Sequence, residues 1–416
     1  MRPKVALIGV SGFASFYYQD LLQLAKEGRL ALTAATVINP DAEPEKCENL
    51  RKAGCQIFSD YREMLSVHRK GLDLCVVPTG IHHHAPMTLA ALDAGCHVLL
   101  EKPAAATVEE VDQMSLASQA ANRFVAIGYQ HMYAPETHRL KTALGDGLVG
   151  KIHTIKCLGL WPRNADYYIR NDWAGKLKAG QHWVLDSPFN NAFAHWLNLM
   201  LFFAGAEFSH GAKPVSIEAE LYRTRPIPST DSACLRIQTD TGIRILFWAS
   251  HSCQRDFGPV MEISGDRGTV IWTNEQILHR TSEGESVFAS SSGMQECRDH
   301  MLQAVLNKIA GRSSFICGLD LAGLQTLCAN AAFACADIHT IEPGYLEPGG
   351  ADHGDAFAIK GIEESCLKAF ELEQLWGEMP LPWSQSAGAM ECAHFPSFEE
   401  AAKHRQHLLG RMARAV

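Results

Sequence analysis

Two side chains are the leading candidates for catalysis. His195 has the chemistry to move a proton, and Lys102 has the chemistry to stabilise negative charge on an oxygen. Residues 98–103, V-L-L-E-K-P, predict a buried strand, and parallel strands deliver their last residues to the sheet edge where ligands bind. We therefore expect Lys102 to face a cleft, although a solvated lysine is the ordinary alternative. The His195 imidazole suits a general base, while the ammonium can donate a hydrogen bond to the same oxygen. Such a pair could oxidise a secondary alcohol whose hydride leaves for a nicotinamide.

A helix that carries His195 is the second feature of interest. Ser187 is a suitable N-cap for a helix over residues 188–204, most of which are apolar. On that helix Asn191, His195 and Asn198 fall at positions i, i+4 and i+7, which makes a polar stripe. We predict that Asn191 and His195 act in catalysis; the alternative is a buried histidine satisfied by Asn191 and nearby backbone.

The stretch of residues 161–173 is rich in aromatic and hydrogen-bonding side chains. Such a mixture suits a polyhydroxylated ring, although an ordinary surface loop has a similar composition. From this stretch and its neighbours we predict a set of substrate contacts: Gln130, Trp161, Arg163, Asn164, Tyr168, Trp173 and Asn190.

A glycine-rich turn follows the first apolar run of the chain, residues 5–10, and leads into a helical pattern. Strand, glycine turn and helix in this order are the context of a dinucleotide fingerprint. Against G-x-G-x-x-G, Gly9 supplies the tight turn and Ala14 the close packing, while Ser11 replaces the middle glycine and Gly12 follows it. A phosphate would lie against the N–H groups of the helix start. A plain turn between a strand and a helix is the alternative.

Asn39 follows the second predicted strand, residues 32–38, where an acidic residue usually binds the adenosine ribose. Its amide can also bind a ribose hydroxyl, and three acidic neighbours against one lysine favour NAD over NADP. Three adjacent histidines, residues 82–84, are expected in a loop; they cannot all face one metal, so we predict no metal site and one histidine near the cofactor. The predicted cofactor contacts are Gly9, Ser11, Gly12, Phe13, Ala14, Asn39, Pro78, Thr79, His84, Glu101 and Lys102.

The elements that must position these residues change in kind along the chain. Up to about residue 128, apolar runs alternate with helical patterns, which predicts a doubly wound parallel sheet. Longer alternating strands then predict a large, open, mostly antiparallel sheet. A chain of 416 residues is too long for one ordinary core. We predict an α/β protein with a nucleotide-binding domain at 1–128, an α/β domain at 129–342 and an extension at 343–416 that packs on the body.

Composition narrows the class of partner. The net charge of -9 argues against nucleic acid and anionic membranes, which leaves small polar molecules. The first apolar run is too short for a signal sequence or a membrane span, so a cytoplasmic protein is expected. Thirteen cysteines without a C-x-x-C pair fit reduced thiols better than a disulfide framework.

Three features together resemble the Gfo/Idh/MocA oxidoreductase family: the glycine turn, the run A-A-L-D-A-G-C-H-V-L-L-E-K-P at 90–103, and the helix bearing His195. The resemblance implies a Rossmann domain, an α/β domain whose open sheet forms the interface of a homo-oligomer (dimer or tetramer), and NAD(P)-linked chemistry on sugars or cyclitols. Lys102 matches the lysine of the family's E-K-P motif and His195 the histidine of its D-x-x-x-H motif. Asn191 departs from the aspartate of that motif, and an amide cannot stabilise an imidazolium with a full charge.

The predicted function is therefore an NAD(P)-dependent dehydrogenase that transfers a hydride between nicotinamide and a CH–OH group of a sugar, sugar acid or cyclitol. Two alternatives come with it. One is an NAD-dependent glycosidase or lyase that oxidises its sugar only transiently. The other is a non-catalytic NAD-binding sensor, which the departure at Asn191 favours slightly.

Overall fold

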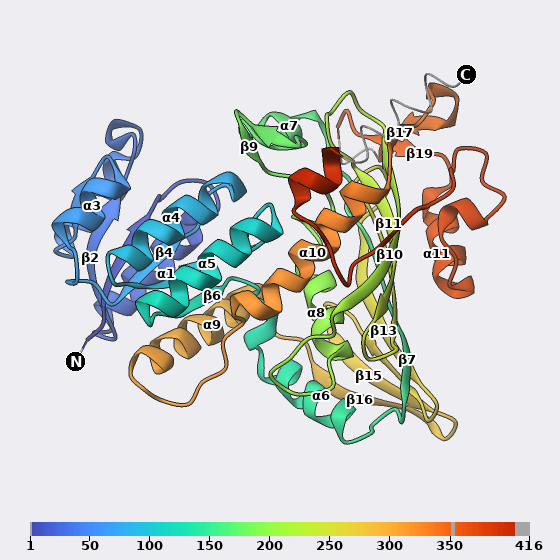
Figure 1. The fold of residues 1–416 in the computed structure, drawn as a ribbon, viewed down its shortest axis with the longest axis horizontal. Helices are drawn as coiled ribbons and strands as arrows, with labels where there is room; N and C mark the ends of the chain where they lie inside the picture. The colour runs from blue at the N-terminus through green and yellow to red at the C-terminus, as the bar shows by residue number, and fades with distance from the viewer. Residues whose placement is uncertain (1, 351–353, 404–416) are drawn as a thin grey trace. The chain divides into compact units, whose positions relative to one another are not determined.

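The computed structural model describes residues 2–350 and 354–403 (Figure 1) and divides into two compact units. The first is formed by the chain up to Ala105, by Glu110–Tyr133 and by Met294–Ala322, and the second by the rest of the described chain. None of the described helices combines the length and hydropathy needed to cross a membrane.

The first unit is built on a parallel sheet of six strands in the order β3-β2-β1-β4-β5-β6. This is the doubly wound dinucleotide-binding order, in which the chain reverses direction between β1 and β4, the point where such sheets bind ligands at the carboxyl ends of their strands. The central strands are buried along almost their whole length, which explains their continuous apolar runs. The strands are β1 (Lys4–Ile8), β2 (Ala31–Thr36), β3 (Gln56–Phe58), β4 (Leu74–Val77), β5 (His97–Leu100) and β6 (Val125–Ile127).

Helices cover both faces of this sheet. Tyr17, Leu21 and Leu24 of α1 recur at helical spacing and are buried, so the helix packs through one apolar stripe. The helices are α1 (Ala14–Lys26), α2 (Pro44–Lys52), α3 (Tyr61–Val67), α4 (Ile81–Asp93), α5 (Val108–Ala121) and α9 (Met294–Ile309), with short 3₁₀ turns η1 (Pro40–Ala42) and η2 (Gln130–Tyr133).

The first unit is not the single continuous range 1–128: it includes Met294–Ala322, which contains α9, whereas Ala106–Glu109 belongs to the second unit. Arg298 of α9 pairs with Asp20 of α1 at 3.1 Å, both side chains being nearly buried, and the N–H of Ile127 in β6 donates to the carbonyl of Cys317. A helical pattern in the sequence predicts a helix but says nothing of the sheet to which the helix returns.

The second unit contains a ten-stranded mixed sheet in which most neighbouring strands are antiparallel, as predicted. Its main path is β16-β15-β14-β13-β7-β12-β11-β10-β17, with β20 beside β10. The strands are β7 (Ile152–Leu160), β10 (Pro214–Arg223), β11 (Ser232–Thr239), β12 (Arg244–Ser250), β13 (Phe257–Gly265), β14 (Thr269–Trp272), β15 (Gln276–Thr281), β16 (Gly284–Ser290), β17 (Ile338–Thr340) and β20 (Gly388–Glu391). Two short hairpins join β8 (Lys178–Ala179) to β9 (His182–Trp183) and β18 (Leu346–Pro348) to β19 (Phe357–Ile359).

One face of this sheet, the inner face, packs against α8 (Ala194–Ala204). Trp196 and Phe203 of α8 place their rings 5.9 and 5.7 Å from that of Trp272 in β14. The remaining helices of the unit are α6 (Pro135–Gly145), α7 (Ala165–Ile169), α10 (Leu319–Cys335, from residue 323 on) and α11 (Ile362–Leu372), with η3 (Pro343–Tyr345) and η5 (Trp376–Glu378).

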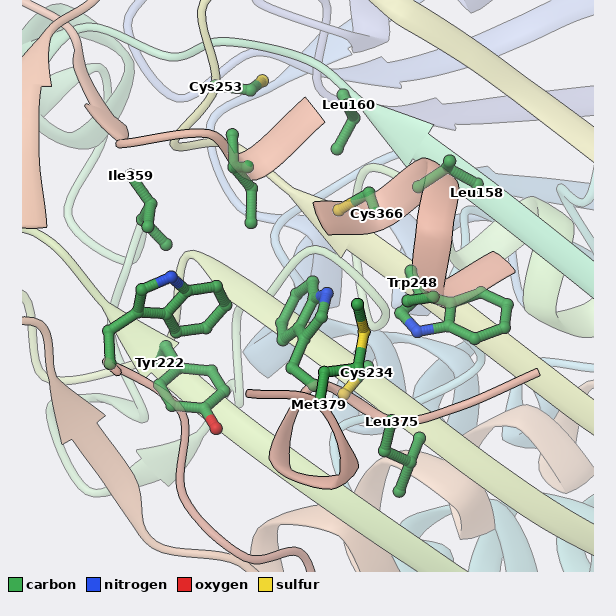
Figure 2. Packing of buried hydrophobic residues seen from close by; sticks show 14 of the residues in the cluster. Leu158, Leu160, Tyr222, Cys234, Trp248, Cys253, Ile359, Cys366, Leu375 and Met379 are labelled. Carbon is green, nitrogen blue, oxygen red and sulfur yellow. The ribbon is translucent and has the colours of Figure 1, made fainter. Parts of the chain in front are cut away.

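The C-terminal part of the chain from Ile359 to Trp383, termed the tail, packs on the opposite, outer face over strands β7, β12, β11 and β10. Figure 2 shows Leu158, Trp248, Cys234 and Tyr222 of these strands facing tail residues such as Met379 in one apolar core. The Tyr222 ring lies 5.7 Å from Trp376 and 5.3 Å from Trp383. A predicted oligomer interface on this sheet therefore cannot use that part of the outer face, because the tail already buries it.

Candidate active site

The glycine turn after β1 has the backbone that a dinucleotide needs. Gly9 and Gly12 adopt φ of +91° and +58°, a left-handed region that side chains disfavour. A Cβ built on Gly12 would meet nothing within 4 Å, so the turn is open there, and Phe13 is 43% exposed at the start of α1. Ala14 is buried and allows close packing of the helix start. An open turn with a helix N-terminus fits a pyrophosphate.

A polar network lies beside this turn. The Ser11 hydroxyl donates to Oε1 of Glu43 at 2.5 Å, and Lys46 pairs with Oε2 of Glu43 at 3.0 Å while donating to the Val10 carbonyl. These bonds lower the pKa of Glu43, so its charge persists near the turn. Asn39 is exposed just after β2. A carboxylate from the start of α2 thus stands near the turn, and the sequence analysis had counted Glu43 only as a nearby acid.

The end of β4 is held by a buried histidine. His84 is fully buried, with Nδ1 2.8 Å from the Pro103 carbonyl and Nε2 3.0 Å from the Thr79 carbonyl. Burial lowers its pKa to about 4, so the ring is neutral and only one of the two carbonyls receives its N–H. His84 therefore ties the chain after β4 to the chain after β5, which is a positioning role.

The expectation that residues 82–84 form a loop is wrong. All three lie in the first turn of α4, which begins at Ile81 after Gly80, with the N–H of His83 bonded to the Gly80 carbonyl. Pro86 lies inside α4, where it removes only one backbone donor near the N-terminal end. No cluster of three or more metal-binding side chains occurs within residues 2–350 and 354–403.

Lys102 follows β5, where a buried carboxylate holds the chain. Oε2 of Glu101 accepts the Lys102 backbone N–H at 2.9 Å, and Oε1 accepts the Tyr17 hydroxyl of α1 at 2.6 Å. Burial raises the pKa of Glu101, and the positive charge of Lys102 opposes that rise. A Cβ on Gly128 would lie 2.8 Å from Oε1 and 2.9 Å from the Tyr17 oxygen, so only glycine fits there. The sequence analysis missed the roles of Tyr17 and Gly128; only contacts across the sheet reveal them.

In the second unit the helix bearing His195 begins later than expected. The chain from residue 188 to 193 is a turn, and α8 starts at Ala194, so Asn191 does not lie on the helix. Ser187 does accept the Asn190 N–H at 3.2 Å, as an N-cap would. The Asn190 amide, however, donates to two carbonyls behind it and accepts from Gln325, which pulls the turn away from helical geometry.

Asn191 is hydrogen-bonded to a carboxylate that the sequence analysis did not select. Its Nδ2 donates to Oδ1 of Asp186 at 2.8 Å, and Oδ2 of Asp186 accepts the Gly175 N–H at 2.6 Å. Asp186 is 4% exposed and His195, in the first turn of α8, is 8% exposed. A negative charge therefore lies one hydrogen bond from the position where the resemblance implies an aspartate. The sequence signal that could have revealed this carboxylate is an acidic residue within an apolar run, five positions before Asn191.

The predicted substrate contacts of the second unit gather after β7. The Trp161 ring packs in a tilted arrangement against Phe193, the residue before α8, at 4.2 Å between centroids. Arg163 lies over the Trp161 and Tyr167 rings. Tyr168 packs edge-on against Tyr167 at 5.1 Å. Of these side chains, Trp161 contacts Phe193, two residues before His195.

The other predicted contacts have structural partners. Asn164 caps α7 by accepting the N–H of Tyr167, and Asn171 accepts the N–H of Trp173. Asn190 is fully buried, and its amide is engaged within the unit, so we assign it to holding the turn. Gln130 is 1% exposed in the first unit, where its amide lies 3.7 Å from the Met294 sulfur.

Two family models match the chain. Residues 3–129 match one described as an oxidoreductase family with an NAD-binding Rossmann fold, and residues 137–271 match the GFO/IDH/MocA C-terminal domain. The chain belongs to the Gfo/Idh/MocA oxidoreductase family. The predicted family, the α/β fold and the NAD cofactor are thereby confirmed. This Gfo/Idh/MocA protein is an NAD-dependent dehydrogenase, as predicted.

Individual relatives of this Gfo/Idh/MocA protein are distant. An inositol 2-dehydrogenase/D-chiro-inositol 3-dehydrogenase of Shouchella clausii (strain KSM-K16) is 22% identical over 286 residues, 68% of this chain and 76% of that protein. A D-glucoside 3-dehydrogenase of Escherichia coli (strain K12) is 30% identical over 158 residues, 38% of this chain and 43% of that protein. The WlbA dehydrogenase from Bordetella pertussis, solved with NADH and UDP-GlcNAcA, superposes with a TM-score of 0.66 at 18% identity, covering 80% of this chain and 96% of that one.

Proposed function

We propose that this dehydrogenase acts on a CH–OH group of a sugar, sugar acid or cyclitol, with Lys102 and His195 acting on the same substrate oxygen. The observation that carries the assignment is the hydrogen bond between Asn191 and the buried Asp186 carboxylate. It supplies the negative charge that the departure at Asn191 had put in doubt, and so favours an enzyme over a sensor. The inositol and glucoside dehydrogenases to which the chain is similar support this substrate class.

Each residue has one task in this proposal. Bound NAD supplies the acceptor for the hydride that leaves the carbinol carbon. Neutral His195 takes the hydroxyl proton, and the Asp186 charge stabilises the resulting imidazolium through Asn191. The Lys102 ammonium donates a hydrogen bond to the oxygen as negative charge develops on it. Ketone reduction uses the same groups in reverse.

The cofactor contacts follow the open turn of the first unit. We propose that the N–H groups around Gly12 and Phe13 bind the pyrophosphate, while Asn39 and the charged Glu43 face the ribose. A carboxylate there repels a 2′-phosphate, so NAD is preferred to NADP. Glu101, His84 and Thr79 hold the strand ends against which the nicotinamide would lie.

A panel of sugars, sugar acids and inositols tests the proposal. Each compound is incubated with the full-length protein and NAD or NADP, and absorbance of the reduced cofactor is read together with the products. We expect stoichiometric oxidation of at least one polyol and formation of NADH. Release of a free sugar without net NADH would assign the protein to the redox-assisted hydrolases or lyases instead. Cofactor binding without reaction of any polyol would favour the sensor.

We propose in addition that the protein is cytoplasmic and forms a homo-oligomer through its large sheet. The tail leaves the strands β13–β16 for such contacts, and Val287 of β16 is 62% exposed. Sedimentation of the purified protein, with Val287→Asp as the variant, tests this association.

A further inference from the structure

A pair of arginines near His195 carries a further inference about the substrate. The Arg163 guanidinium lies 4.9 Å from the centroid of the Tyr167 ring, and that of Arg170 lies 3.5 Å from it. Arg170 also lies 5.6 Å from the Trp173 ring. Both positive charges therefore share one aromatic platform in the chain that follows β7.

Neither guanidinium has a carboxylate partner among the residues that the structure describes. Arg163 donates to the Pro162 carbonyl at 3.3 Å, its Nε is buried without a partner in the described chain, and Arg170 donates to the Tyr167 carbonyl. Burial, and after it the charge of Asp186, raises the pKa of Tyr167. The Asp186 carboxylate already accepts hydrogen bonds from Gly175 and Asn191.

Several other arginines of the same unit are paired with carboxylates. Arg236 contacts Glu218 and Glu378, and the Arg280 guanidinium lies 2.7 Å from Glu285. Arg223 and Arg267 also lack a carboxylate partner among the described residues and donate to hydroxyl or carbonyl oxygens. What sets Arg163 and Arg170 apart, in a chain with a net charge of -9, is that both guanidiniums lie over the same Tyr167 ring. Their mutual repulsion is relieved by an anion between them.

Ring contacts connect this arginine pair to the segment that bears His195. Tyr167 lies 5.6 Å from His251, and His251 stacks on Phe193 at 5.7 Å, two residues before His195. Arg163 also lies over Trp161, whose ring packs against the same Phe193. The charges of Arg163 and Arg170 contribute, after burial, to lowering the pKa of His251 to about 3, so this ring adds no positive charge.

We propose that the substrate of this site bears a carboxylate, which is bound by Arg163 and Arg170, the two arginines that lie over the Tyr167 ring. The guanidinium fork matches a carboxylate through paired N–H bonds, and stacking on an aromatic ring fixes the orientation of the fork. The inference rests on the proposed function and narrows it to polyhydroxylated acids, such as an aldonate or a uronate. The arginines bind the carboxylate of the substrate, and a neighbouring CH–OH group is the position that is oxidised.

Binding of matched ligands to the NAD-loaded protein tests the proposal. D-gluconate and D-glucuronate are compared with D-glucose and with glucose 6-phosphate, using quenching of tryptophan fluorescence and NADH formation as separate readouts. We expect the two acids to bind about tenfold to a hundredfold more tightly than glucose, the range for hydrogen bonds to charged groups. Equal binding of acids and glucose, or a preference for the phosphate, would overturn the carboxylate assignment.

Variants of the two arginines test whether the preference for acids arises at this site. Arg170 is exposed, so Arg170→Gln should fold normally and lose most of the preference for acids, while Arg170→Lys should retain part of it because the charge stays but the fork is lost. Arg163→Gln should act in the same direction. Arg280→Gln removes the same charge from a paired arginine of the same unit and should leave the preference unchanged; a loss there equal to that in Arg170→Gln would refute the site.

The two readouts separate this inference from the proposed function. Tight binding of acids without NADH from any polyol would contradict the dehydrogenase assignment and leave the anion site standing. If neutral sugars yield NADH and a carboxylate on the sugar does not tighten binding, the dehydrogenase assignment stands and the anion site is refuted.

Discussion

Glu101 in the first unit and Asp186 in the second are both buried carboxylates beside a predicted catalytic residue, but they support it differently. Glu101 binds the backbone N–H of Lys102 and the Tyr17 hydroxyl, so it fixes where the chain lies after β5. Asp186 binds the side chain of Asn191, four residues before His195 in the sequence, and in the proposed mechanism its charge acts through that amide. A buried carboxylate can thus fix the position of a catalytic residue, as Glu101 does, or change the stability of its charged form, as we propose for Asp186.

The largest effects are expected at the supported residues themselves. Lys102→Ala and His195→Ala should each reduce turnover by about a hundredfold or more, because each removes a group that acts only as the transition state forms. The affinity for NAD, measured by fluorescence titration, should stay close to that of the unaltered protein. Unchanged turnover in both variants would remove these residues from the mechanism.

A smaller but more specific effect is expected when the charge of Asp186 is removed. Asp186→Asn should lower turnover roughly tenfold to a hundredfold, since the imidazolium loses a charged partner. The same loss should move the acid limb of the pH–rate profile to lower pH, because His195 then releases its proton more readily. A purely structural role would lower turnover without moving that limb.

The exchange variant Asp186→Asn with Asn191→Asp is the matched control. It keeps one carboxylate and one amide in the same contact with the direction of the hydrogen bond reversed, so it should recover most of the turnover. Asn191→Asp alone places two carboxylates together and should be the least stable of the three variants in a thermal melt. If the exchange variant is as slow as Asp186→Asn, the charge does not act through this pair.

For Glu101 the comparison predicts a loss of stability. Tyr17→Phe removes the hydroxyl that Glu101 accepts, and an unsatisfied buried carboxylate costs about 1–3 kcal/mol of unfolding free energy. Tyr18, the next residue of α1, is the control, since its buried hydroxyl has no partner in the described chain, and Tyr18→Phe should be neutral or slightly stabilising. Equal losses in denaturant titrations of the two variants would show that the bond to Glu101 contributes nothing.

Glu220 provides a reference for both sites, as a buried carboxylate with no predicted catalytic neighbour. It accepts the Gly377 N–H at 2.9 Å and the Tyr222 hydroxyl at 2.8 Å, and burial raises its pKa from 4.5 to about 7. Because the folded state holds this proton more tightly, its contribution to stability is complete below about pH 4.5 and is lost as the pH rises through 7.

The Glu220→Gln variant tests whether Glu220 makes the protein less stable as the pH rises. Glutamine cannot ionise, so the free energy of unfolding of the variant should fall less between pH 5 and pH 8 than that of the unaltered protein, with a difference on the order of 1 kcal/mol. Denaturant titrations at the two pH values measure it. Parallel pH profiles would mean that Glu220 is ionised throughout or does not contribute.

The two sites also differ in how far the sequence could predict them. The strand before Lys102 was predictable because a continuous apolar run bounded by polar residues matches a buried parallel strand. The turn before α8 was not, because the side chain of Asn190 competes for backbone carbonyls, and propensity rules place a helix after Ser187 and Pro188. For the same reason the partner of Asn191 could not be read from periodicity; the Asp186 contact depends on the turn's actual path.

Long-range placement was equally beyond the sequence. The residues of α9 read as a helix, yet its partner Asp20 lies nearly three hundred positions earlier in the chain. Gly128 looked like the end of a strand, and only the neighbouring Glu101 and Tyr17 explain why no larger residue fits. Local patterns therefore predicted the elements, whereas the contacts that hold the catalytic residues come from packing.

The tail that packs on the large sheet has a consequence for how the protein behaves on dilution. A sheet face that is covered by a second subunit is exposed again when the concentration falls below the dissociation constant. The face over β7, β12, β11 and β10 is covered by the same polypeptide, so its local concentration is fixed by the covalent chain. That half of the sheet should therefore stay shielded from solvent in the most dilute sample, whatever the rest of the surface binds.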